Sequence, residues 1–175
     1  MKTNYLIFFI LFCLPSNELF SQVGIGTTTI SHNAILEFGS ENKGIILPWV
    51  TSAAAVVTPS GGTLIFDCND KKVKYYNNNS TSWVDLSIES GAVDTSNQDS
   101  FSEQAIHFKA VIGNPNTTKK GVLILDTTDK ALVLPKIDDV TLNFPNPEAG
   151  TIVYDTSRKK MAVFNGLVWT FWGEP

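Results

Sequence analysis

Short apolar runs separated by polar turns dominate this chain of 175 residues. The runs have the length and alternation of β-strands, and Gly, Asn, Asp and Ser cluster between them. In the first half of the chain they lie at 35–38, 45–50, 64–66 and 72–76. Pro48 cannot donate to a sheet ladder, so the run at 45–50 is expected to end there or to lie at a sheet edge.

The pattern occurs twice. Leu36 lies 87 positions before Leu123, and after one inserted residue Asp67 lies 88 positions before Asp155. Each copy continues as Gly-Thr, an apolar strand, Asp, a polar turn with two lysines, a second apolar strand, Asn and Trp. Internal repeats of this kind indicate a duplicated structural unit.

We therefore predict an all-β fold of two tandem antiparallel β-meander units related by this internal repeat. The expected boundaries are a signal peptide at 1–21, unit one at 22–86, a linker and lead-in strand at 87–109, and unit two at 110–175. Residues 87–104 are rich in Ser, Asp, Asn and Gln, which is typical of an exposed connection.

Two local features add detail. Residues 51–57 contain three alanines and predict a helical turn, with Thr51 or Ser52 as its N-cap. Asn165-Gly166 predicts a two-residue hairpin turn of type I′, which needs a positive φ at both central residues.

Both faces of the predicted hairpins carry apolar side chains. Val73 and Tyr75 share one face and Tyr76 lies on the other, and Phe164 takes the place of Tyr76 in the second copy. A second layer must therefore cover each face. Either the two units pack on each other within one chain, or separate chains associate.

The first 21 residues have the pattern of a cleaved secretory signal. Lys2 precedes an unbroken apolar run from Tyr5 to Leu14, which is shorter than the ~20 residues of a membrane-spanning helix. Gln22 is the expected mature start, so we predict an exported protein that is periplasmic, cell-surface or extracellular and does not span the membrane. Cys68 is then the one remaining cysteine, so no internal disulfide is expected, and we interpret it as an incidental turn residue.

No pattern in the chain predicts catalysis or a cofactor. His32 and His107 stand apart from any zinc-ligand spacing, and no nucleophile elbow or nucleotide-binding loop is present, so we expect neither an enzyme nor a cofactor. The net charge of −4 argues against a general nucleic-acid binder. Residues 67–70 bring oxygen atoms together as calcium loops do, but we favour the interpretation that Asp67 and Asp155 end a strand and bond their own turn amides.

Aromatic side chains are frequent in and beside the repeats. Most are expected in the core, yet secreted β-modules also use exposed aromatic rings to bind sugars or partner chains. The candidate interaction surface comprises Trp49, Tyr76, Phe164 and Trp172.

Four motifs stand out along the chain: Val23–Thr27, Ala34–Glu37, Lys43–Pro48 and the Gly-Thr…Asp…Tyr-Tyr-Asn…Trp hairpins. They resemble a repeat of secreted Bacteroidetes proteins and of phage tail-fibre-like proteins. The chain departs from the family at Trp49 and Lys136, where an Arg is usual.

This resemblance implies a non-enzymatic extracellular structural or interaction protein of adhesin or fibre type. It also favours self-association, because fibre proteins are often trimers. The alternative is a carbohydrate-binding module that holds a surface glycan on exposed aromatics.

Overall fold

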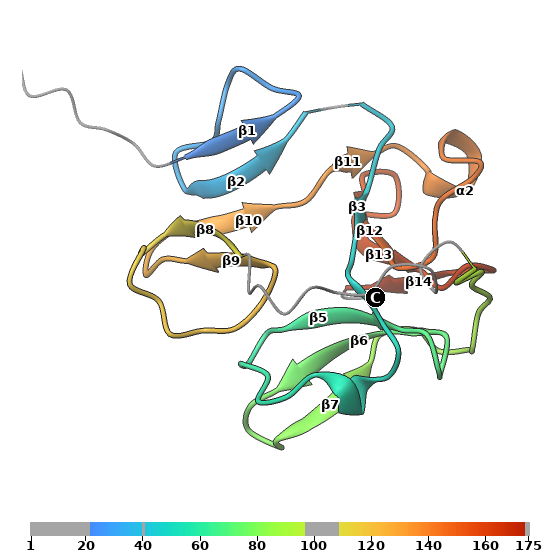
Figure 1. Ribbon diagram of the computed structural model, residues 1–175. Coiled ribbons are helices and arrows are strands. Elements are labelled where there is room, and N and C mark those ends of the chain that lie inside the picture. The colour runs from blue at the N-terminus through green and yellow to red at the C-terminus, as the bar shows by residue number, and fades with distance from the viewer. Residues whose placement is uncertain (1–21, 40, 97–108, 174–175) are drawn as a thin grey trace, which may run out of the picture.

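The computed structural model describes residues 22–39, 41–96 and 109–173, and within them the chain is almost entirely β-structure (Figure 1). The first copy contains β1 (Val23–Ile25), β2 (Ala34–Phe38), β3 (Ile45–Ile46), β4 (Trp49–Val50), the 3-10 turn η1 (Ala53–Ala55), β5 (Leu64–Asp67), β6 (Lys72–Asn77) and β7 (Ser82–Asp85). The second copy contains β8 (Ala110–Gly113), β9 (Leu123–Asp126), β10 (Ala131–Val133), β11 (Lys136–Ile137), the helix α2 (Val140–Asn143), β12 (Thr151–Asp155), β13 (Lys160–Phe164) and β14 (Trp169–Trp172). The predicted all-β class is confirmed, whereas the predicted signal peptide at 1–21 lies outside the described residues.

The sheets mix strands from both copies. β5, β6 and β7 are antiparallel neighbours, as are β12, β13 and β14, and β4 and β11 add parallel strands to β5 and β12. However, β3 of the first copy pairs with β12 of the second, and β10 of the second copy pairs with β2 of the first. The prediction of two tandem antiparallel meander units is therefore wrong in that form, because the copies exchange strands and use parallel pairs.

Pro48 explains how one apolar run reaches both copies. It divides the run at 45–50 into β3 and β4, so that β3 bridges to β12 while β4 stays beside β5 of its own copy. Pro48 still accepts a hydrogen bond at its carbonyl, from the amide of Phe66 at 2.9 Å. In Figure 1 the chain passes beside β12 at β3 and then continues toward β5.

One hydrophobic core is shared by the two copies. Phe66 and Val73 from the first copy are fully buried together with Ile152 and Val163 from the second. Leu47, Leu86 and Ala149 complete the buried cluster. Each copy therefore provides the second layer that the other one needs, which is the intramolecular alternative set out above.

A separate cluster of buried residues covers the opposite face of the second-copy sheet. Val153 and Ala162 pack there against Ile137 and Val140, at the start of α2, with Trp169 and Phe171 at the margin. The alternation along β12 and β13 thus buries residues on both faces, as their two-sided apolar pattern predicts.

The helical turns are capped differently from the prediction. Ser52 is the N-cap of η1 but makes no side-chain cap hydrogen bond. Instead, the carboxylate of Asp67 accepts from the amide of Ala53 at 2.9 Å, and that of Asp155 accepts from the amide of Val140 at 3.2 Å. At η1 the aspartate at the end of β5 thus takes the role of the capping side chain in place of Thr51 and Ser52. In α2 the N-cap Asp139 also accepts from the amide of Thr141, at 3.1 Å.

The turn at Asn165-Gly166 is also longer than predicted. Four residues separate β13 from β14, and only Gly166 has a positive φ, at 94°. Asn165 keeps a negative φ because its side chain organises the loop, accepting from the amides of Leu167 and Val168 at 2.9 and 2.8 Å. Asn77 accepts in the same way from the amide of Asn79 in the first copy.

Because the core is shared, Ile152→Ala should destabilise the whole described fold in one transition. Removing this buried side chain is expected to lower the free energy of unfolding by about 2–5 kcal/mol. The matched control is Ile88→Ala at an exposed position, expected to change it by less than about 0.5 kcal/mol. Urea unfolding at one protein concentration measures both, and equal losses for the two variants would contradict the shared core.

Candidate functional site

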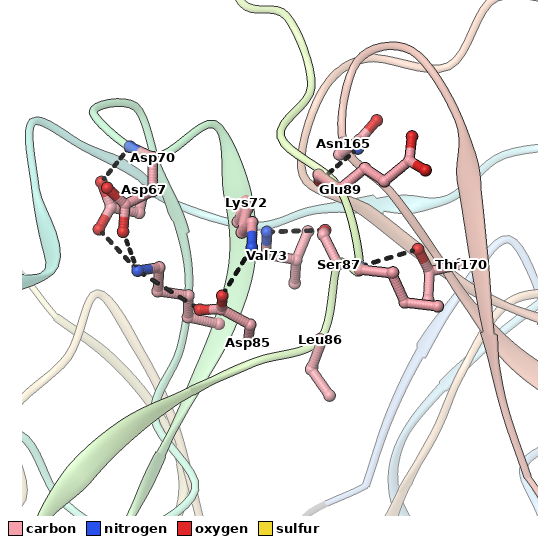
Figure 2. A network of polar contacts seen from close by, with 12 residues as sticks. Asp67, Asp70, Lys72, Val73, Asp85, Leu86, Ser87, Glu89, Asn165 and Thr170 are labelled. Carbon is pink, nitrogen blue, oxygen red and sulfur yellow. Dashed lines mark hydrogen bonds and ion pairs between the residues drawn. The ribbon is translucent and has the colours of Figure 1, made fainter.

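The segment after β7 crosses from the first copy onto the second. The hydroxyl of Ser87 accepts from the amide of Val73 at 3.0 Å, and the next amide, that of Ile88, donates to the hydroxyl of Thr170 at 3.4 Å. Ser87 itself is buried. Figure 2 shows Ser87 between the first-copy strand and the second-copy strand.

Contacts at Asn165 and Trp172 fix the segment further. Asn165 donates from Nδ2 to the carbonyl of Glu89 at 2.8 Å, and Trp172 donates from Nε1 to the carbonyl of Leu86 at 2.6 Å. A β-carbon at Gly91 would lie 1.7 Å from the backbone oxygen of Asn165, so only glycine fits there. This junction is a polar seam between the copies.

A compact charge cluster occupies the outer face of the first-copy sheet. Lys74 is buried and its ammonium lies beside Asp70, and 3.4 Å from both Asp67 and Asp85. Burial lowers the pKa of Lys74, but the hydrogen bond to Asp70 and the charges of Asp85 and Asp67 outweigh it and raise the pKa above its usual value. Lys74 therefore stays charged and holds three strand and turn ends together.

In the second copy, the counter-charge of the strand-end aspartate comes from a different position in the repeat. Arg158 lies in the turn, where its guanidinium contacts Asp155 at 2.7 Å and Asp139 at 2.8 Å. Burial raises the pKa of Asp155, but the amides of Arg158 and Val140 and then the guanidinium outweigh it, so the pKa lies below its usual value. The guanidinium also lies 4.8 Å from the ring centre of Phe171.

Both aspartates bond the amides of their own turns, so this interpretation is confirmed. Asp67 accepts from the amides of Asn69 and Asp70 at 3.0 and 3.2 Å, and Asp155 accepts from the amide of Arg158 at 2.7 Å. Within the described part of the chain, no group of three or more His, Cys, Asp and Glu side chains is placed to hold a metal ion.

The other singled-out polar residues stand apart from these clusters. His32 is exposed and its Nδ1 lies 3.2 Å from Oδ1 of Asn33, while His107 is outside the described residues. Cys68 is a half-buried free thiol, and burial, together with the charge of Asp67, raises its pKa. A raised pKa disfavours the thiolate that reactive cysteines need.

The predicted interaction residues lie on four different strands. Trp49 is half-buried on β4, contacts Phe66 at 6.1 Å between ring centres, and donates from Nε1 to the carbonyl of Ala149 at 2.7 Å. Trp172 on β14 is 41% exposed, although its indole nitrogen is already bonded at the junction.

Tyr76 and Phe164 occupy equivalent positions in the two copies, and each packs against a tryptophan ring. Tyr76 packs edge-on against Trp83 at 5.3 Å, and Phe164 packs against Trp169 at 5.2 Å. Both are half-buried. The role of all four aromatic residues in binding stays a prediction.

A larger apolar feature escaped the sequence reasoning. A cavity of about 500 Å³ opens between β3, the start of β5, β9 and β10, and several large apolar side chains beside it are exposed. Those that also line it are Ile46, Val57, Val122, Leu123 and Leu132. The signal was present in the sequence, because these residues form apolar strand runs that two small units could not all cover.

Asp155→Asn should flatten the pH dependence of stability in acid. The folded pKa of Asp155 is depressed, so its stabilisation is present above the ordinary value of 3.8 and is lost as the pH falls through the lower folded value. Near neutral pH the change should cost about 1.5–3 kcal/mol, because charged hydrogen bonds are lost.

Urea unfolding between pH 2 and 7 measures this effect. Asp129→Asn, at an exposed aspartate outside the cluster, is the control and should leave the wild-type slope. A wild-type slope in Asp155→Asn would contradict the role of the buried carboxylate.

Among residues 22–39, 41–96 and 109–173, no helix is both long enough and apolar enough to span a membrane.

Comparison with known proteins places the chain in a family. No curated protein and no solved structure matches the chain. A family model described as a phage tail-like trimerisation region matches residues 24–100 and 111–173. The chain therefore belongs to the phage tail-like trimerisation region family, which is a structural class and not an enzyme class.

Proposed function

We propose that this chain is a non-enzymatic structural module of an extracellular fibre and that three copies of it assemble. The observation that carries the proposal is the family match, which spans both copies of the repeat and describes a trimerisation region, and such a region implies self-association. The apolar residues left exposed on β3, β9 and β10 support it, because an exposed apolar surface of this kind marks interaction sites.

We also propose that the protein is exported through the signal peptide at 1–21. The support is the apolar run behind Lys2 and the turn residues that follow it. A fibre role outside the cell fits the tail-like family and the Bacteroidetes-type repeat motifs. An adhesive contact with another surface is a further step of the same proposal.

The carbohydrate-binding alternative has one observation in its favour. Trp172 exposes part of its ring at the end of the second-copy sheet, where a sugar could stack. The other three aromatics are half-buried and pack on neighbouring side chains. We therefore rank self-association first, and a glycan array on the purified chain separates the two functions.

Light scattering coupled to gel filtration tests the assembly directly. The chain from Gln22 onward should elute as a species with three times the mass of one chain at micromolar concentration. It should stay associated in high salt, since apolar burial is screened little by ions. A monomer under these conditions would refute the proposed function.

A further inference from the structure

Most strand pairings recur in the two copies with the same register. β1 pairs with β2 as β8 pairs with β9, so that Val23 opposite Leu36 corresponds to Ala110 opposite Leu123. β4 pairs with β5 as β11 pairs with β12, and the hairpins correspond in the same way. The copies are therefore equivalent at the level of backbone pairing.

Among the described strands two pairings occur in one copy of the repeat and not in the other, and both join the copies. β10 of the second copy lies on the outer edge of β2, and β3 of the first copy lies against the start of β12. The equivalent places are the outer edge of β9 and the start of β5. Among the described strands nothing pairs at either place, because β8 and β9 form a two-stranded sheet and β4 covers only the end of β5.

Side-chain exposure follows this difference at the edge of β9. Ile35 and Leu36 are each 2% exposed beneath the β10 pairing. Their equivalents Val122 and Leu123 are 61% and 47% exposed. The residue types are large and apolar in both copies, so the difference comes from the surroundings, which at β2 include both β10 and the neighbouring strand β8.

The start of β5 shows the same contrast. A β-carbon at Gly150 would lie 2.9 Å from Cβ of Phe66, and the carbonyl of Gly150 accepts from the amide of Leu47 at 3.0 Å. At Gly62, the equivalent residue, nothing lies within 4 Å of the same position. The two glycines share a positive φ, at 80° and 83°, so their backbones are alike and their surroundings are not.

For each of these two unpaired places, the chain contains a strand equivalent to the one that pairs there in the other copy. The β9 edge needs an equivalent of β10, which is β3, and the β5 start needs an equivalent of β3, which is β10. Each of these two strands is paired along one edge, and no described strand pairs with its other edge. Strands from both places line the apolar cavity of about 500 Å³.

We propose that a second copy of this chain occupies these places. β3 of one copy pairs in parallel with β9 of the neighbour, and β10 of the neighbour pairs antiparallel with the start of β5 of the first. One contact thus completes both missing pairings and covers Val122, Leu123 and Ile46. The contact is head-to-tail, since it joins different surfaces, and it gives the proposed trimer where the rotation between neighbouring copies closes into a ring of three. The inference rests on the proposed self-association and names the surface that carries it.

Engineered cysteines test the register of this contact. Leu36 lies opposite Leu132, so Leu123 of one copy should lie opposite Ile45 of the next. Thr151 lies opposite Ile46 next to a hydrogen-bonded pair, so Thr63 should lie opposite Val133 with the short spacing that a disulfide accepts. The variants are Ile45→Cys with Leu123→Cys, and separately Thr63→Cys with Val133→Cys.

The background is the chain from Gln22 with Cys68→Thr, the residue of the second copy at that place. After mild oxidation, each pair should give a covalent species of three chains on a non-reducing gel. Each single-cysteine chain should stay unlinked, because the contact is head-to-tail. Ile45→Cys with Leu125→Cys is the control pair, two residues out of register, and should link far less.

The outcomes separate this inference from the proposed function. A disulfide confined to one chain in both pairs would show that the chain closes on itself and would overturn the inference. Absence of any link in both pairs, with a parent chain that is still trimeric by light scattering, would assign the assembly to another surface and also overturn it. A monomeric parent chain would refute the proposed function itself.

Discussion

The fold depends on the burial of a single apolar layer between two copies of one repeat. Phe66 and Val73 contribute from one side, and Ile152 and Val163 from the other. A three-stranded hairpin sheet alone has too little buried surface to be stable, and the described chain has no disulfide to compensate. The strand exchange, the polar seam at Ser87 and the indole hydrogen bond of Trp172 are all consequences of keeping the two sheets in contact.

The sequence was informative wherever a local rule decides the structure. Strand alternation predicted the all-β class and the two apolar faces, and Pro48 predicted the end of an apolar run. The same reasoning anticipated that Asp67 and Asp155 bond their turn amides, because a short carboxylate after a strand reaches the next amides easily. These features depend on neighbours in the chain, which a sequence displays directly.

Features that depend on distant residues were missed. Nothing local indicates that β3 leaves its own copy for β12, or that Asp67 caps a helical turn in place of Ser52. The turn at Asn165 differed because its side chain accepts from two loop amides and donates to Glu89, far away in sequence. The position of the apolar cavity was likewise missed, because a sequence displays the apolar runs but does not display which strand edges beside them stay unpaired.

The placement of the cations has a consequence for protein engineering. Asp67 forms an ion pair with Lys74 on the next strand of the same hairpin, and Asp155 forms one with Arg158 in the following turn. Each of these carboxylates and its cationic partner thus lie within a stretch of fewer than ten residues. A hairpin grafted from one copy onto the other would bring the counter-charge of its aspartate with it. Arrays built from the second version would also need Asp139, the other partner of Arg158, which precedes the hairpin.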